Sequence, residues 1–203
     1  MKNIITSCLV LLLFASCGSE SQNKYLTYQN IVILSDMSSR LDNRPQRDID
    51  EIRKIVQFFN NECVKPGEKI GDKSCISFSA FSEKTAATID INKIKNLGEK
   101  QRFINSTAEY KLCGLSHHIT NFDSTVRNVY EKTRNEGLDL ISLLIEKISN
   151  EPIIKEDTYL TDGIDTTYLA YENHIYIFTD GYLEYRGKRA NSQFYFGSSE
   201  IEK

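Results

Sequence analysis

The stretch Ile31-Val32-Ile33-Leu34-Ser35-Asp36 decides the fold class of this chain. Its four apolar residues, three of them β-branched, follow one another without a polar break. Such a run predicts a strand that is buried on both faces, as in a parallel sheet. Ligands of open parallel sheets gather at the carboxyl ends of strands. The aspartate that ends this run is therefore the first candidate functional residue.

A second run, Ile175-Tyr176-Ile177-Phe178, is also apolar on both faces and leads into Thr179-Asp180-Gly181. Two such runs, each ending in an aspartate, predict two central strands with their carboxyl ends at one edge of a sheet. We expect Ile33 and Ile177 to lie on neighbouring parallel strands and to be nearly fully buried.

The pattern between the two runs indicates helices and further strands. Apolar residues recur at helical spacing after Pro45, alternate with polar ones over 74–81, and recur at helical spacing again before Pro152. This order predicts an α/β fold, with a doubly wound, mostly parallel central sheet flanked by helices. After the second run only Gln193 to Gly197 is extended in pattern, so the domain is expected to be cut short on its C-terminal side.

The N-terminus has the pattern of a cleavable signal peptide. Lys2 is positive, residues 4–14 are almost wholly apolar, and two small residues precede Cys17. The apolar run is about half the roughly 20 residues that a spanning helix needs. The stretch resembles a bacterial lipobox, in which the cysteine is acylated and becomes the new N-terminus, although Phe14 departs from the usual Leu, Val or Ile. The alternative is an ordinary signal peptide in which Cys17 is incidental.

We expect a signal peptide over residues 1–16, a polar tether over 17–24 and one α/β domain over 25–203. The lipobox resemblance implies a lipoprotein, palmitate included, in the cell envelope, at the outer membrane or the periplasmic face. The formal net charge of −3 is spread over interspersed acids and bases, which argues against a nucleic-acid surface. Export permits one disulfide, but small buried hydrophobic side chains are the expected role of Cys63, Cys75 and Cys113.

The stretches Asp36-Met37-Ser38-Ser39-Arg40 and Thr179-Asp180-Gly181 together resemble the von Willebrand factor A domain. That family has a buried strand ending in Asp-x-Ser-x-Ser, a threonine in a later loop and another strand ending in an aspartate. These residues form its metal-ion-dependent adhesion site. The element order follows the family over most of 25–203, while the motifs cover only the two stretches.

The resemblance implies a magnesium site formed by Asp36, Ser38, Thr120 and Asp180. Hydroxyl, carboxylate and water oxygens are the hard ligands that Mg²⁺ prefers. Thr120 is chosen because it precedes a helix that we expect to begin near Asp123, and Thr125 is the second choice. Helix capping is the other explanation for Thr120, and strand-end turn chemistry is the other explanation for the two aspartates.

The position of the family's second serine is held by Arg40, and Ser39 is adjacent but one residue out of register. An arginine that points into the site would repel a divalent ion and could replace it by pairing with a carboxylate. If it points to solvent, Ser39 or water can complete the shell. The sequence leaves both directions of Arg40 open.

These residues predict a lipid-anchored binding module that recognises a protein or peptide ligand through a divalent metal at the strand ends. Catalysis is not expected, because the sequence has no nucleophile with an obvious base, no glycine-rich phosphate loop and no metal-ligating cluster of His and Glu. Two alternatives stay open. One is a metal-assisted hydrolase that uses Asp36 and Asp180, and the other is a structural envelope protein with a degenerate metal site.

Overall fold

The computed structural model describes residues 23–37, 44–68, 72–133, 140–151, 153–161 and 165–179. Within them the strands are β1 (Lys24–Ser35), β2 (Cys75–Ala80), β3 (Ala87–Asp90), β4 (Thr158–Thr161) and β5 (Thr166–Phe178). The α-helices are α2 (Arg44–Phe58), α3 (Leu97–Ile104), α4 (Leu115–Lys132) and α5 (Leu140–Asn150). A π-helical turn, Phe59–Val64, extends α2, and short 3-10 turns cover Ile91–Lys93 and Ala108–Lys111. No helix in this part of the chain is both long and apolar enough to cross a membrane.

The chain divides into two compact units. The smaller comprises residues 1–26 and 157–170, and what is described of it is the start of β1 with the hairpin of β4 and the first part of β5. The larger comprises residues 27–156 and 171–203, and it contains α2 to α5. The aspartate that ends the first apolar run lies in the larger unit.

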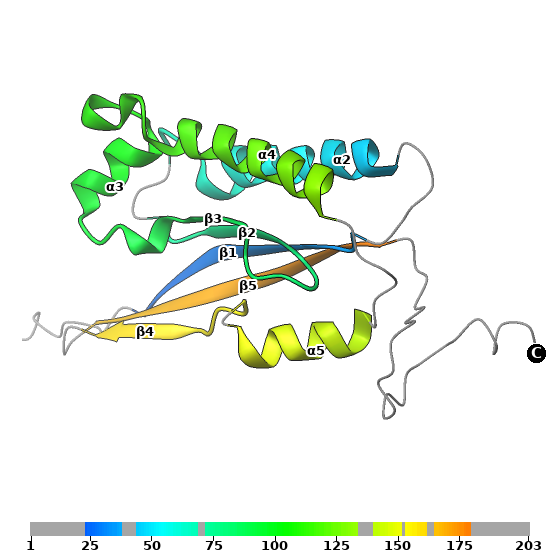
Figure 1. The fold of residues 1–203 in the computed structure, drawn as a ribbon. Coiled ribbons are helices and arrows are strands. Elements are labelled where there is room, and N and C mark those ends of the chain that lie inside the picture. The colour runs from blue at the N-terminus through cyan, green and yellow to red at the C-terminus, as the bar shows by residue number, and fades with distance from the viewer. Residues whose placement is uncertain are drawn as a thin grey trace, which may run out of the picture. The chain divides into compact units, whose positions relative to one another are not determined.

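The strands form a sheet in the order β3-β2-β1-β5-β4. β1 and β2 are parallel, with Ile33 opposite Phe78, while β2–β3 and β4–β5 are antiparallel pairs. β5 runs in the direction of β1, because Asn30 bonds Asn173 and the Asp36 N–H donates to the Phe178 carbonyl farther along both strands. The two apolar runs therefore lie on neighbouring parallel strands, as predicted (Figure 1). The fold is mixed α/β.

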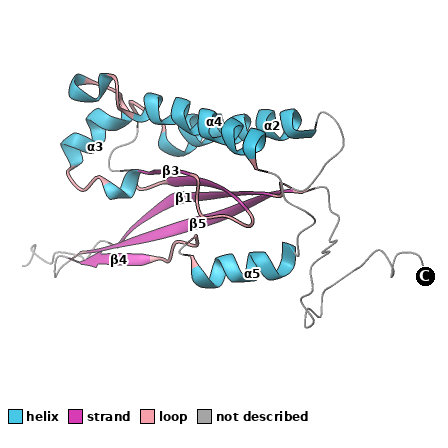
Figure 2. Cartoon of the chain, viewed as in Figure 1, coloured by secondary structure: helices cyan, strands magenta, loops and turns pink. Residues whose placement is uncertain are grey.

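Apolar side chains of β1 pack on both faces, because successive residues of a strand point to opposite sides. Ile31 and Ile33 belong to the core formed with α2 and α4, whereas Val32 and Leu34 pack in a second cluster with Leu140 of α5. Figure 2 shows α2, α3 and α4 on one side of these strands and α5 on the other. Helices thus cover both faces of β1, which explains its unbroken apolar sequence.

The prediction that Ile33 and Ile177 are both buried is right for the first and wrong for the second. Ile33 is 0% exposed, whereas Ile177 is 43% exposed. β4 pairs with β5 only as far as Leu169, so among the described residues the second half of β5 has a neighbouring strand on one side only. An apolar run on an edge resembles a central strand in sequence. The strand expected at Gln193 to Gly197 lies outside the described residues.

Two asparagine side chains fasten the segment after α5 to the sheet. Asn30 Nδ2 donates to the carbonyl oxygen of Ile153 and to Asn173 Oδ1, both at 2.7 Å. Asn173 also pairs with the backbone of Lys155, accepting from its N–H at 2.9 Å and donating to its carbonyl at 3.0 Å. A buried amide needs such partners, and here they hold residues 153–155 against β1 and β5.

Candidate functional site

Two polar residues are buried at the carboxyl end of β1. Ser35 and Asp36 are 0% and 1% exposed. Their backbone groups are satisfied by the flanking chain, since the Phe81 N–H donates to the Ser35 carbonyl at 3.0 Å and the Asp36 N–H to the Phe178 carbonyl at 2.8 Å. The sheet therefore holds both side chains in place at the strand end where a ligand site was expected.

The side chain of Asp36 contacts the end of β5. Thr179 Oγ1 donates a hydrogen bond to Asp36 Oδ2 at 3.2 Å. Asp180 is the next residue in the sequence after this threonine. The structure thus brings the end of the second apolar run to Asp36, as the sequence predicted.

A tyrosine of α4 joins the same strand end. Tyr130 Oη lies 2.9 Å from Ser35 Oγ and 3.3 Å from Asp48 Oδ2, and all three residues are buried. One phenolic proton serves one of the two acceptors at a time. A tyrosine on the buried face of a helix needs a partner for its hydroxyl, and this need was the signal that could have found the contact.

Thr120 does not lie at this strand end. Its helix begins at Leu115, so the predicted start near Asp123 is wrong. The Thr120 hydroxyl is exposed and donates to the Ser116 carbonyl at 3.1 Å, and Thr125 donates to the Asn121 carbonyl at 2.8 Å. Both are bonds to the preceding turn of the helix.

The C-terminal end of α4 lies by β1, where Tyr130 reaches Ser35. Thr120 precedes Tyr130 by about 15 Å along the helix axis, at the α-helical rise per residue. The threonine that follows α4 directly is Thr133, which caps its last turn by donating its N–H to the Val129 carbonyl at 2.9 Å. By position on the helix, Thr133 is the better candidate for a hydroxyl near Asp36.

The other predicted site residues lie outside the described part of the chain. They are Cys17, Ser38, Ser39, Arg40 and Asp180. Of the expected magnesium ligands, the described residues therefore place only Asp36 at the strand end. The described chain contains no cluster of three or more His, Cys, Asp or Glu side chains that could hold a metal ion. A site built mainly on hydroxyl and water oxygens would not form such a cluster.

An open groove of about 430 Å³ lies between α2 and the end of β5. Its lining is mainly apolar and consists of Glu51, Lys54, Ile55, Phe58, Tyr176 and Phe178. Phe58 and Tyr176 are large exposed side chains.

The described cysteines are free thiols. Cys63 and Cys75 are buried, as expected for small hydrophobic side chains, while Cys113 is exposed. Burial, and secondly the Asp90 carboxylate, raise the pKa of the Cys75 thiol to about 11. A thiol with this pKa is unreactive at neutral pH, so Cys75 does not offer a nucleophile.

Comparisons of the chain with protein-family models, with curated proteins and with solved structures give no match. The resemblance to the von Willebrand factor A domain therefore rests on the two quoted stretches and on the order of the elements.

Proposed function

We propose that this chain is a lipid-anchored binding module of the bacterial cell envelope, which recognises a protein or peptide ligand at the carboxyl ends of β1 and β5. The observation that carries the proposal is the burial of Asp36 where these two strands end together. Burying a carboxylate is unfavourable unless it is compensated. The Asp36 carboxylate is a hard oxygen donor held at the point where the two strands end, and this supports a ligand-related role.

Binding fits the described residues better than catalysis does. Ser35 is buried, and its described hydroxyl partner is Tyr130 rather than a histidine that could act as its base. The exposed histidines, His117 and His118, are on the first turn of α4, away from the end that contacts β1. A nucleophile and its base must lie within hydrogen-bond reach of each other.

Magnesium is the proposed occupant of the strand end. The donors that the described residues bring there are the Asp36 carboxylate and the hydroxyl of Thr179. These are hard oxygens of the kind that Mg²⁺ prefers. Bound there, the ion would supply a positive centre for a carboxylate of the ligand.

Calorimetric titration with magnesium and manganese tests the site on four proteins. They are the wild type, Asp36→Ala, Arg40→Ser and the control Asp123→Ala, whose carboxylate pairs with Arg53 and Arg127 on the helix surface. We expect Arg40→Ser to bind more tightly than wild type, Asp36→Ala to lose binding and the control to match wild type. If all four titrate alike, the strand end is not a metal site.

The lipid anchor has a separate test. Intact-mass analysis of the mature protein is expected to show two or three acyl chains on Cys17, since one chain alone gives marginal anchoring. Cys17→Ser should move the protein out of the detergent phase. A mature N-terminus without acyl chains would exclude the anchor.

A further inference from the structure

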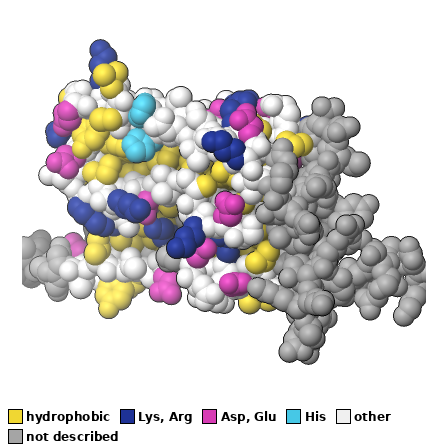
Figure 3. Space-filling model, viewed as in Figure 1, with side chains coloured by type: hydrophobic (Ala, Val, Ile, Leu, Met, Phe, Trp, Pro, Cys, Tyr) yellow, Lys and Arg dark blue, Asp and Glu magenta, His cyan; other side chains and the backbone are white. Residues whose placement is uncertain are grey.

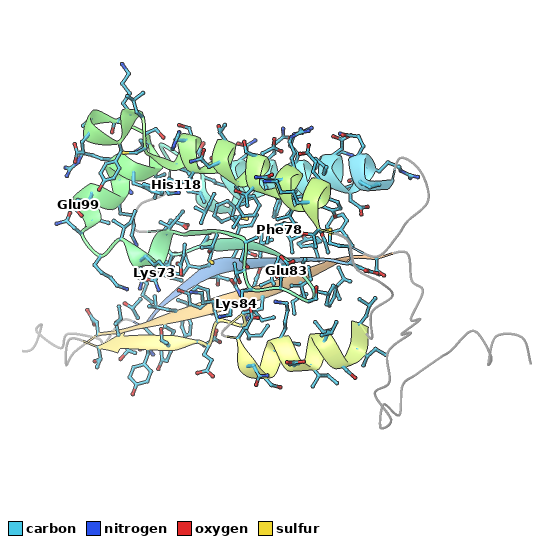
Figure 4. All side chains as sticks on the ribbon, viewed as in Figure 1. Lys73, Phe78, Glu83, Lys84, Glu99 and His118 are labelled. Atoms are coloured by element: carbon cyan, nitrogen blue, oxygen red, sulfur yellow. The ribbon has the colours of Figure 1, made fainter. Side chains whose placement is uncertain are left out.

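Lysines from several segments of the larger unit gather at the amino end of β2. This basic cluster consists of Lys73, Lys93, Lys95, Lys100 and Lys155. Lys73 and Lys95 both lie near enough to Lys100 to lower its pKa, and Lys155 bonds Asp90 at 3.0 Å. Figure 3 shows dark blue side chains, with magenta ones among them, on the face that includes this end of the sheet, and Figure 4 places Lys73 at the end of the sheet below α3.

The two carboxylates within the basic cluster face inward. Asp72 is 0% exposed and accepts from the Ser74 N–H at 2.6 Å, and the side chain of Asp90 is mostly buried beside Lys155. Lys93 and Lys95 are exposed and Lys73 is half-buried. Lys73, Lys93 and Lys95 therefore present positive charge at the surface of a chain whose net charge is −3.

Lys73 and Lys95 have no carboxylate partner among the described residues. Lys100 is only 5% exposed, and its ammonium donates to the Asp72 carbonyl at 2.7 Å. The pKa of Lys73 is lowered by burial and then by Lys95, and that of Lys100 by burial and then by Lys73. Like charges held together in this way are stabilised by an anionic partner.

The basic cluster lies where the chain enters the larger unit. Lys73 Nζ is 6.0 Å from the ring centroid of Tyr28, next to Thr27, the first residue of this unit. The segment from Cys17 to Thr27 spans at most about 35 Å even when fully extended. A lipid on Cys17 would therefore keep the cluster within reach of the membrane surface.

We infer that the basic cluster binds the anionic headgroups of the membrane in which the chain is anchored. The choice of a membrane as partner rests on the proposed lipid anchor. β1 runs from Tyr28, beside the cluster, to the strand end at Asp36, roughly 26 Å away at the rise of an extended strand. A bilayer bound at the cluster leaves the proposed ligand site at the opposite end of the strand, facing away from the lipid.

Vesicle flotation tests this inference on the mature chain, residues 17–203, carrying Cys17→Ser so that no acyl chain contributes. The vesicles are phosphatidylcholine with or without phosphatidylglycerol. The test variant is Lys73→Gln/Lys95→Gln. The matched control is Lys54→Gln/Lys132→Gln, which removes two exposed lysines from α2 and the end of α4.

The protein with all of its lysines should bind only the vesicles that contain phosphatidylglycerol, and this binding should weaken with added salt. Each lysine should strengthen partitioning onto anionic vesicles by about fivefold. The test variant should therefore bind on the order of twentyfold more weakly, while the control keeps wild-type binding. The inference would be wrong if the protein bound neither vesicle type, or bound both equally. It would also be wrong if both variants lost binding equally, or if the protein bound polyglutamate but no vesicles. If intact-mass analysis finds no acyl chains on Cys17, the proposed anchor is wrong, but the vesicle experiment still measures whether the basic cluster binds anionic lipid.

Discussion

Tyr130 on α4 and Ser35 at the end of β1 are joined through their hydroxyl oxygens, which are 2.9 Å apart in the core. Asp48 of α2 lies 3.3 Å from the same phenolic oxygen. One side chain therefore ties two helices to the strand end that carries the proposed ligand site. Substituting Tyr130 with phenylalanine removes only this hydroxyl, because the two side chains have the same ring.

Tyr130→Phe should lower the free energy of unfolding by about 1–3 kcal/mol, because it leaves buried polar atoms of Ser35 and Asp48 without this partner. Urea unfolding measures the change. Tyr110→Phe is the matched control, since its ring packs on Phe103 at a partly exposed position. Equal stability of the two variants would show that the hydroxyl contact contributes nothing.

Ile33→Asp and Ile177→Asp are expected to differ although both residues stand in the apolar runs. The first places a charge in a fully buried site and should cost several kcal/mol or prevent folding. The second changes a side chain that is 43% exposed and should cost about 1 kcal/mol or less. Thermal unfolding of both variants decides, and a large loss at Ile177 would mean that other parts of the chain bury this position.

Gly114→Ala should destabilise the protein through sterics. A Cβ at Gly114, the N-cap of α4, would meet the Tyr110 carbonyl at 2.6 Å and the Phe103 carbonyl at 2.8 Å. Backbone atoms cannot move aside as a flexible side chain can, so a loss of about 1–3 kcal/mol is expected. Gly98→Ala is the comparison, because its Cβ would meet only side-chain atoms, and its stability should stay within about 1 kcal/mol of wild type. Denaturant midpoints that rank the two variants in the reverse order would refute the steric argument.

The thiol of Cys75 should make stability fall at alkaline pH. Its pKa is raised in the folded state, from 9.0 to about 11, so the folded protein holds the proton more tightly than the unfolded chain. This contribution is fully present below pH 9 and is lost as the pH rises toward 11, by roughly 3 kcal/mol in all. Cys75→Ala lacks the thiol and should show a shallower decline. Parallel curves of unfolding free energy against pH would contradict the predicted burial.

The sequence predicted the elements whose periodicity is set by burial. The run from Ile31 to Leu34 is apolar because helices cover both of its faces, and α2 shows one apolar stripe because one face meets the core. The strand ends followed from the same argument, which placed Asp36 beside the end of β5. The first half of β5 was not predicted, because β4 is exposed, the first half of β5 is mostly half-buried, and burial therefore imposes no clear period on either.

The candidate site was less predictable, because its partners come from distant elements. Tyr130 reaches Ser35 across 95 positions of sequence, and only packing determines that contact. The start of α4 was misplaced because His, Thr and Asn are weak helix formers. The helix begins at Leu115, and its N-cap, Gly114, has no side chain that could signal the start. Thr120 was therefore read as a loop residue, although it stands inside a helix.

The pair of hydrogen bonds between Asn173 and the backbone of Lys155 has a consequence for how this chain could be altered. These two residues flank the stretch from Asp157 to Ala170, and both belong to the larger unit. The base of the hairpin between them is thus closed by hydrogen bonds within the larger unit. A hairpin closed at its base in this way should tolerate shortening or exchange, as long as Asn173 is kept.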